Sequence, residues 1–180
     1  MSLTLSGTTG IVNSNMASNS VNGGNIVDGS VTDSKLNLSV KPMFSAYLST
    51  TQSVTSSTPT KCTINTKEFD STNAYDNITN YRFQPLKAGK YQVSAQIGVA
   101  TTNTLTNTFI AIYKNGSLFK RGTTVQLPSA VSNTNANISI IVDMNGSTDY
   151  LEVYGYVTAT AAVFTGGADY TYFQAHYIGA

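Results

Sequence analysis

The feature that most constrains the fold is a stretch from Tyr91 to Val99 in which apolar residues alternate with polar or small ones. Side chains of a β-strand point alternately to its two faces, so this pattern predicts a strand with one buried face. Nowhere does an apolar stripe persist at helical spacing for three turns, whereas turn residues recur between short apolar runs. The chain is therefore predicted to be all-β, as a sandwich or a jelly roll.

Two further patterns add to this prediction. Residues 138–144 alternate in the same way, and Asn145-Gly146-Ser147 leads into residues 150–157, which predicts a hairpin. Residues 109–113 and 170–178 are apolar on both faces. A strand with bulk on both faces needs cover on both, so we expect a second sheet on one side and another subunit on the other.

Residues 1–40 contain no aromatic residue and are rich in Asn, Ser and Gly. Their apolar residues recur at every fifth position, at Ile11, Met16, Val21, Ile26, Val31 and Leu36. This spacing fits a repeated short extension with a turn better than a helix or a strand. We interpret residues 1–40 as an extended N-terminal anchoring arm and residues 41–180 as a head; chance spacing in a disordered tail is the alternative.

The composition limits the choice of partner. Charged residues make up 11% of the chain, and ten Lys and Arg nearly balance nine Asp and Glu, so nucleic acid is not an expected partner. No apolar run approaches the roughly 20 residues that cross a bilayer, so no membrane insertion is expected. Nor does the N-terminus have the pattern of a secretion signal. One cysteine, Cys62, excludes an internal disulfide framework.

A series of anchor residues runs in a fixed order from Phe44 to Ala175. They are Phe44-Ser45-Ala46-Tyr47-Leu48, Phe69-Asp70, Asn73, Tyr75-Asp76, Phe83-Gln84-Pro85, Gly89-Lys90-Tyr91-Gln92-Val93, Lys114-Asn115-Gly116, Asp149-Tyr150-Leu151-Glu152-Val153 and Tyr172-Phe173-Gln174-Ala175. The series resembles the globular head of complement C-one-q, a relative of the tumour necrosis factor fold. Ala175 stands where that family usually has glycine, and no collagen-like stalk precedes the head.

The resemblance implies a ten-stranded jelly-roll sandwich that forms a homotrimer around an axis lined by aromatic and apolar residues. Tyrosine provides a large contact area with a hydroxyl that can stay hydrated, which suits such an interface. We therefore expect four tyrosines at the trimer interface: Tyr154, Tyr156, Tyr172 and Tyr177.

The arm has a resemblance of its own. Residues 6–11 and 25–36 resemble the opening of tailed-phage fibre and head-decoration proteins. This implies that residues 1–40 attach the chain to a major capsid protein or a tail protein, on the surface of a virion assembled in the host cytoplasm.

Residues that could carry chemistry are few. His176, the one histidine, lies mid-strand beside apolar neighbours and is expected to be structural. Cys62 has no second residue to activate it. Asp143 and Asp149 flank one turn and are weak candidates for a metal site, with solvated loop acids as the ordinary interpretation. We expect no enzymatic activity, no catalytic residue and no cofactor.

Together, arm and head predict a structural virion surface protein of a tailed bacteriophage, in which the arm anchors a trimeric knob to the capsid as a decoration or cement protein or a short head fibre. The alternative is a short tail fibre or receptor-binding tip that recognises a host surface glycan or protein through outer loops. Its candidate residues are Tyr75, Asn103, Asn107, Asn133 and Asn135. A soluble complement-q-like ligand or lectin is a third hypothesis.

Overall fold

The structure is a computed structural model that describes residues 41–127 and 131–180, so the predicted anchoring positions between Ile11 and Leu36 lie outside the described residues. The described chain forms thirteen strands and no helix. The strands are β1 (Met43–Tyr47), β2 (Gln52–Ser53), β3 (Thr60–Lys61), β4 (Thr66–Asp70), β5 (Tyr75–Asp76), β6 (Arg82–Phe83), β7 (Ala88–Ala100), β8 (Asn107–Lys114), β9 (Ser117–Gln126), β10 (Asn133–Asn145), β11 (Leu151–Thr158), β12 (Val163–Phe164) and β13 (Tyr172–Gly179).

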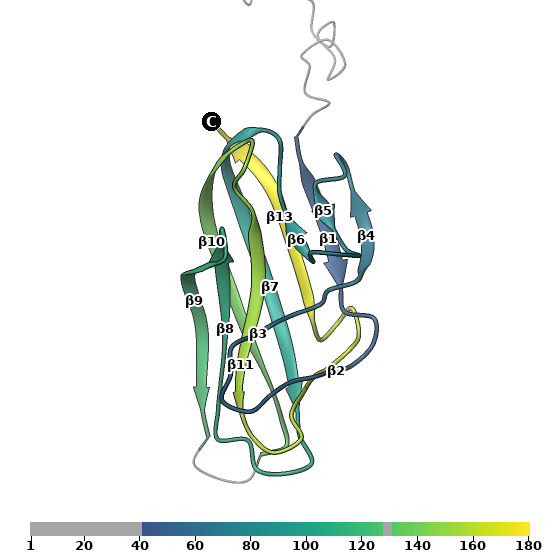
Figure 1. Ribbon diagram of the computed structural model, residues 1–180, viewed down its shortest axis with the longest axis vertical. Coiled ribbons are helices and arrows are strands. Elements are labelled where there is room, and N and C mark those ends of the chain that lie inside the picture. Colours follow the sequence, from purple (N-terminus) through teal and green to yellow (C-terminus); the bar gives the residue numbers. More distant parts are fainter. Residues whose placement is uncertain (1–40, 128–130) are drawn as a thin grey trace, which may run out of the picture. The chain divides into compact units, whose positions relative to one another are not determined.

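The strands form two antiparallel sheets (Figure 1). Sheet A has the order β2-β12-β7-β13-β1-β4, and β10 pairs with the other side of β7. Sheet B has the order β5-β6-β11-β8-β9, and β3 also pairs with β11. Because β7, β10 and β13 lie in one sheet while β8, β9 and β11 lie in the other, the chain crosses repeatedly between the sheets. This is the layout of a jelly roll.

The two ends of the sandwich are distinct. At one end, which we call the base, the backbone N–H of Tyr177 donates to the carbonyl of Pro42 at 3.0 Å, so β13 ends beside the start of β1. The opposite end, which we call the far end, contains the loops that follow β7 and precede β10 (Figure 1).

The core between the sheets is apolar, and its base half is aromatic. The Phe44 ring stacks on Tyr75 at 4.6 Å and on Phe83 at 4.7 Å, and it meets the edge of Phe173 at 4.9 Å. Phe83 in turn contacts Tyr91 at 5.5 Å. All five side chains are at most 2% exposed. Anchor residues from five different strands therefore meet in one aromatic cluster of the core.

A tight turn joins β8 to β9. Lys114 pairs with Ser117 across a two-residue loop, and both Asn115 and Gly116 have positive φ, at 54° and 77°. These angles define a type I′ turn, which suits the right-handed twist of the two strands.

The predicted hairpin of residues 138–144 with 150–157 is wrong. β10 pairs with β7 along its whole length in sheet A, whereas β11 pairs with β8 in sheet B. The turn between them crosses from one sheet to the other. Turn residues mark a change of direction, but they do not determine which strand becomes the neighbour.

The predicted number of ten strands also differs from the thirteen found in the described chain. Five of the thirteen, namely β2, β3, β5, β6 and β12, are only two residues long. Around these short strands, some backbone N–H groups donate to side chains instead of to a neighbouring strand. Asp70 and Asp76 accept such hydrogen bonds around β5. The all-β class itself is confirmed.

Candidate subunit-contact surface

We call the face of sheet A that points away from sheet B the open face of sheet A. The pairing register sets its side chains in three rows across β1, β13, β7 and β10: Tyr47, Tyr172, Gln96 and Asn137; Ser45, Gln174, Ser94 and Ser139; Met43, His176, Gln92 and Ile141. The residues between them in each strand point into the core, as their burial shows.

Large apolar side chains stand unburied on this face. Ile141 is 59% exposed, Phe69 52% and Met43 39%. Met43 and Phe69 line a groove of about 490 Å³ together with Gln92, Gln174 and other residues of β7 and β13. Contiguous exposed apolar surface on a soluble domain marks an interaction site.

The centre of the open face is polar, and the Glu68 carboxylate borders it. Gln92 Nε2 donates to Ser139 Oγ at 2.9 Å, and the Ser94 and Ser139 hydroxyls lie 3.3 Å apart. The Ser45 hydroxyl donates to Glu68 Oε2 at 2.7 Å. These groups are mostly satisfied within the sheet, so covering them with another surface leaves few unpaired donors or acceptors.

A second exposed apolar feature lies at the edge of sheet B. β9 has β8 as its only ladder partner among the described strands, and it is exposed at most positions. Leu118 is 50% exposed and Phe119 38%. Lys120 and Arg121 follow them. This edge combines apolar and basic side chains, as interface residues often do.

Of the four tyrosines predicted at one interface, Tyr154 and Tyr156 lie on the outer face of sheet B. Tyr154 stacks on Tyr113 with ring centroids 3.9 Å apart, and Tyr156 stacks on Phe109 at 4.7 Å. The Arg121 guanidinium lies 3.9 Å from the centre of the Phe109 ring. The outward aromatics of β8 are thus partly covered within the chain, by side chains of β9 and β11.

The other two tyrosines lie elsewhere. Tyr172 is on the open face of sheet A, in the row of Gln96 and Asn137. Tyr177 belongs to the inward side of β13 at the base, where its ring meets Tyr91 at 5.4 Å and Lys87 Nζ lies 4.4 Å from its centre. The four tyrosines do not form one surface. Only Tyr172 belongs to the open face.

The loop residues of the receptor-binding hypothesis are partly brought together. Asn103, in the loop after β7, and Asn133 and Asn135, at the start of β10, are exposed at the far end. Asn107 begins β8, and its side-chain oxygen is buried without a hydrogen-bond partner among the described residues.

The prediction for Tyr75 is wrong. It lies in β5 and is 2% exposed, and its hydroxyl donates to the carbonyl of Ile64 at 2.8 Å. Burial raises the pKa of this hydroxyl above its usual value. Its ring stacks on Phe44 at the base of the core rather than lying in an outer loop.

The two candidate metal acids have different surroundings. Asp149 Oδ2 pairs with Lys114 Nζ at 2.8 Å, and Oδ1 accepts from Asn115 Nδ2 at 2.8 Å. These contacts, with the Asn115 bond the largest cause, lower the pKa of Asp149. Asp143 is exposed, and Lys114 donates to its backbone carbonyl rather than to its carboxylate. Within the described residues, no three metal-ligating side chains are grouped. The Lys114 ammonium occupies the position beside the Asp149 carboxylate that a metal ion would take.

His176 and Cys62 occupy opposite environments. His176 is exposed on the open face of sheet A, between Met43 and Gln92. Cys62 is 1% exposed, and burial raises the pKa of its thiol well above the usual value, which disfavours the reactive thiolate. Across the described residues, no helix is long and apolar enough to span a bilayer.

Known structures share this architecture. Murine APRIL at pH 5.0 superposes with a TM-score of 0.56 and 9% identity, over 77% of this chain and all of that one. The globular domain of zebrafish complement 1qA gives a TM-score of 0.54 and 12% identity, over 77% and 98% of the two chains. The Eiger TNF from S. frugiperda gives 0.55 and 9%, over 78% and 92%. No protein-family profile and no curated protein sequence matches the chain.

The head therefore has the jelly-roll fold of complement 1q and tumour necrosis factor domains, as the anchor series predicted. At these identities the similarity shows the fold alone. The resemblance of residues 1–40 to phage proteins stays a prediction.

Sequence reasoning missed the apolar residues of the open face. Ile141 offered a signal, because it follows Ile140 and so breaks the alternation of its strand. Met43 and Phe69 offered none, since exposure depends on which strands cover them.

Proposed function

We propose that the head is a non-enzymatic structural module that assembles as a homotrimer through the open face of sheet A. The observation that carries this proposal is the pair of exposed apolar side chains Met43 and Phe69 on one groove of that face. Ile141 is exposed on the same face, three strands away on β10. Burying them against another subunit would remove large apolar area from water at about 25 cal/mol per Å².

The complementary surface is the β9 edge of the next subunit. Leu118 and Phe119 supply apolar area there, while the open face supplies the groove. Contact between two different patches is heterologous, and such contacts close into a ring when the rotation fits. Three subunits related in this way bury both exposed surfaces of every subunit.

Multi-angle light scattering on the full chain tests this proposal. A trimer has a mass of about 57 kDa, three times the 19.1 kDa of one chain. A monomeric mass at micromolar protein concentration would contradict it.

We further propose that residues 1–40 anchor this trimer to the capsid of a tailed bacteriophage, as a decoration protein or short head fibre. The support is the five-residue apolar spacing from Ile11 to Leu36 and the resemblance of residues 6–11 and 25–36 to phage proteins. A trimer matches the three-fold and quasi-three-fold sites of a capsid.

Deletion of residues 1–36 tests the anchor. The shortened chain should stay a trimer and no longer sediment with particles. Trimers that still sediment with particles would place the anchor in the head.

The second candidate is a short tail fibre or receptor-binding tip. The exposed amides of Asn103, Asn133 and Asn135 at the far end favour it, since amide-rich loops suit sugar recognition. The number of copies per particle, measured by quantitative mass spectrometry, separates the two. Hundreds of copies would exclude the tail tip, and tens or fewer would exclude capsid decoration.

A further inference from the structure

A second concave site lies at the base, apart from the open face of sheet A. It is a cavity of about 470 Å³ between the loops that flank β5 and the segment that leads into β7. We call it the base pocket. Its lining residues include Thr72, Asn73, Ile78, Arg82, Leu86 and Lys87.

The rim of the base pocket carries the two most exposed of the large apolar residues of the described chain. Leu86 is 80% exposed and Ile78 77%. Single exposed apolar residues are ordinary on a protein surface, but two that share the rim of one cavity form an apolar contact site.

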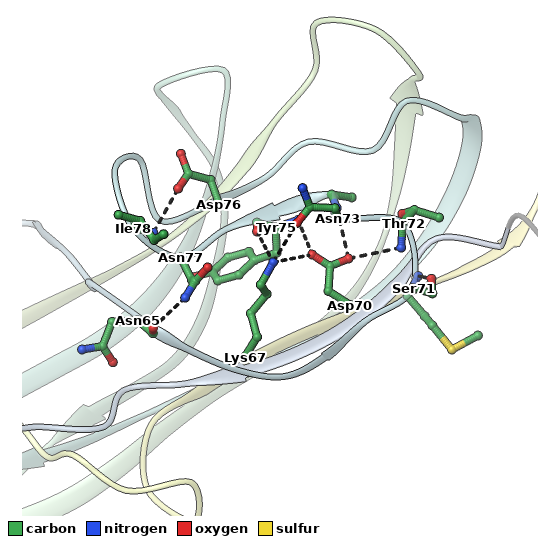
Figure 2. A network of polar contacts seen from close by, with 12 residues as sticks. Asn65, Lys67, Asp70, Ser71, Thr72, Asn73, Tyr75, Asp76, Asn77 and Ile78 are labelled. Carbon is green, nitrogen blue, oxygen red and sulfur yellow. Dashed lines mark hydrogen bonds and ion pairs between the residues drawn. The ribbon is translucent and has the colours of Figure 1, made fainter.

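The pocket lining contains one carboxylate, Asp76, and three cationic side chains, Lys67, Arg82 and Lys87, so positive charge is in excess there. Asp76 and the neighbouring Asp70 both accept hydrogen bonds from their own loops (Figure 2). Asp70 accepts from the backbone N–H groups of Ala74 and Tyr75, each at 3.0 Å, and pairs with Lys67 Nζ at 3.3 Å. Asp76 accepts from the backbone N–H groups of Ile78 and Thr79 at 3.0 and 2.9 Å. Backbone bonds from Thr79 and Ile78 lower the pKa of Asp76 to about 2.

The cations are held differently. The Arg82 guanidinium lies 4.4 Å from the centre of the Tyr150 ring, and Lys87 Nζ lies 4.4 Å from the centre of the Tyr177 ring. The Tyr150 ring orients the Arg82 guanidinium without neutralising its charge. Arg82 takes part in none of the three ion pairs of the described residues. The Thr72 hydroxyl, also at the pocket, is buried without a hydrogen-bond partner there.

We propose that the base pocket binds a segment of a partner protein that presents a carboxylate beside apolar side chains. Arg82 offers a planar fork of N–H donors that matches a carboxylate, and Lys87 adds positive charge. Ile78 and Leu86 cover the neighbouring apolar groups. The cavity volume lies within the range of about 300–1,000 Å³ that is usual for ligand pockets. The site goes beyond the trimer and the anchoring arm, and it needs neither.

The test is an NMR titration of the full-length ¹⁵N-labelled chain with the capped peptide Ac-Leu-Asp-Leu-NH₂ and its matched control Ac-Leu-Asn-Leu-NH₂. The acidic peptide should shift the amide signals of residues 72–78 and 82–87. The neutral peptide should bind about fivefold or more weakly, because a charge-assisted hydrogen bond is lost. Equal binding of both peptides, or no shift in this region at millimolar peptide, would overturn the proposal.

Three variants locate the effect. Arg82→Gln should weaken binding of the acidic peptide about fivefold or more, and Leu86→Ser should weaken it severalfold, since each removes one half of the recognition. Lys90→Gln, an exposed lysine outside the pocket lining, should leave the affinity unchanged. Equal losses in Arg82→Gln and Lys90→Gln would show a diffuse charge effect and refute the site. If inorganic phosphate shifts the same signals and Leu86→Ser has no effect on the peptide, the peptide proposal is wrong and the site binds anions only.

Discussion

The outward faces of the two sheets both carry large apolar or aromatic side chains. On sheet B these side chains contact one another, whereas on sheet A they are exposed to solvent. On sheet B, Phe109, Tyr113, Tyr154 and Tyr156 stack in cross-strand pairs, and Arg121 lies against the Phe109 ring. On sheet A, Met43, Phe69 and Ile141 have no such partners and remain exposed. Apolar content alone therefore does not identify a contact surface. What distinguishes the faces is whether the side chains find cover within the same chain.

The largest expected effect is on assembly. Phe69→Asp places a charge on the groove of the proposed contact, at the β4 edge of sheet A. This charge would have to be buried unpaired, so we expect the trimer to dissociate to monomers at micromolar concentration. Light scattering and sedimentation velocity measure the mass. The matched control on sheet B is Tyr154→Ser, which should keep the trimeric mass. If the Tyr154 variant dissociates and the Phe69 variant does not, the contact lies on sheet B.

The next largest effect concerns the turn that carries the chain from sheet A to sheet B. Asp149→Asn removes the carboxylate that Lys114 and Asn115 bind, at 2.8 Å each, and should lower the free energy of unfolding by about 2 kcal/mol at pH 7. Urea unfolding at one fixed protein concentration measures it, because assembly makes stability depend on concentration. A matched change at the exposed Asp143, Asp143→Asn, should have little effect.

The same residue predicts a pH dependence. The pKa of Asp149 is lower in the folded state than in the unfolded chain, where it is near 3.9. Its contribution to stability is therefore complete above about pH 5 and is lost as the pH falls through the lowered folded pKa. The difference in midpoint temperature between wild type and Asp149→Asn should narrow as the pH falls from 5 to 3. A constant difference across this range would show that the charge of Asp149 is not involved.

A smaller effect is expected within the aromatic pairs of sheet B. A double-mutant cycle of Tyr113→Leu and Tyr154→Leu should give a coupling free energy of about 1 kcal/mol, the usual value for a stacked pair beyond its area burial. Urea unfolding of the four proteins measures it. A coupling indistinguishable from zero would mean that the rings merely lie side by side, and the distinction between the two faces would lose its basis.

The smallest effect is that of the cation beside the same face. Arg121→Gln removes a guanidinium 3.9 Å from the Phe109 ring and should cost about 0.5 kcal/mol, as for exposed cation–π contacts. Urea midpoints measured beside those of Lys120→Gln supply the control, since Lys120 Nζ lies farther from its nearest ring, at 5.8 Å from Phe119. A loss confined to Lys120→Gln would contradict the prediction.

Features that depend on neighbours in the sequence were predictable. The alternation from Tyr91 to Val99 matches the burial pattern of β7. Asn115-Gly116 forms a two-residue turn, because Asn and Gly tolerate the positive φ angles of this turn. The all-β class follows from such local signals. The anchor series also located the aromatic residues that meet in the core, although only the resemblance indicated that they belong together.

The tertiary structure decided what lies beside what. Residues 138–144 and 150–157 have the pattern of a hairpin, yet they enter different sheets. The first segment pairs with β7 and the second with β8, and these partners lie about 45 positions earlier in the sequence, beyond the reach of a local pattern. Tyr75 has the appearance of a loop residue, but the packing of Phe44 against it buries it.

The four tyrosines predicted at the trimer interface show the same division between sequence and fold. The alternation of residues 150–157 largely fixed the direction of Tyr154 and Tyr156 relative to the core, whereas the strand of Tyr172 is apolar on both faces and left its direction open. Only the fold decided that Tyr154 and Tyr156 face outward from sheet B, where Tyr113 and Phe109 cover them, and that Tyr172 lies on the open face of sheet A. Alternation with a period of two residues indicates which side chains of a strand share a face. Which residues cover that face is set by contacts between strands that are distant in the sequence.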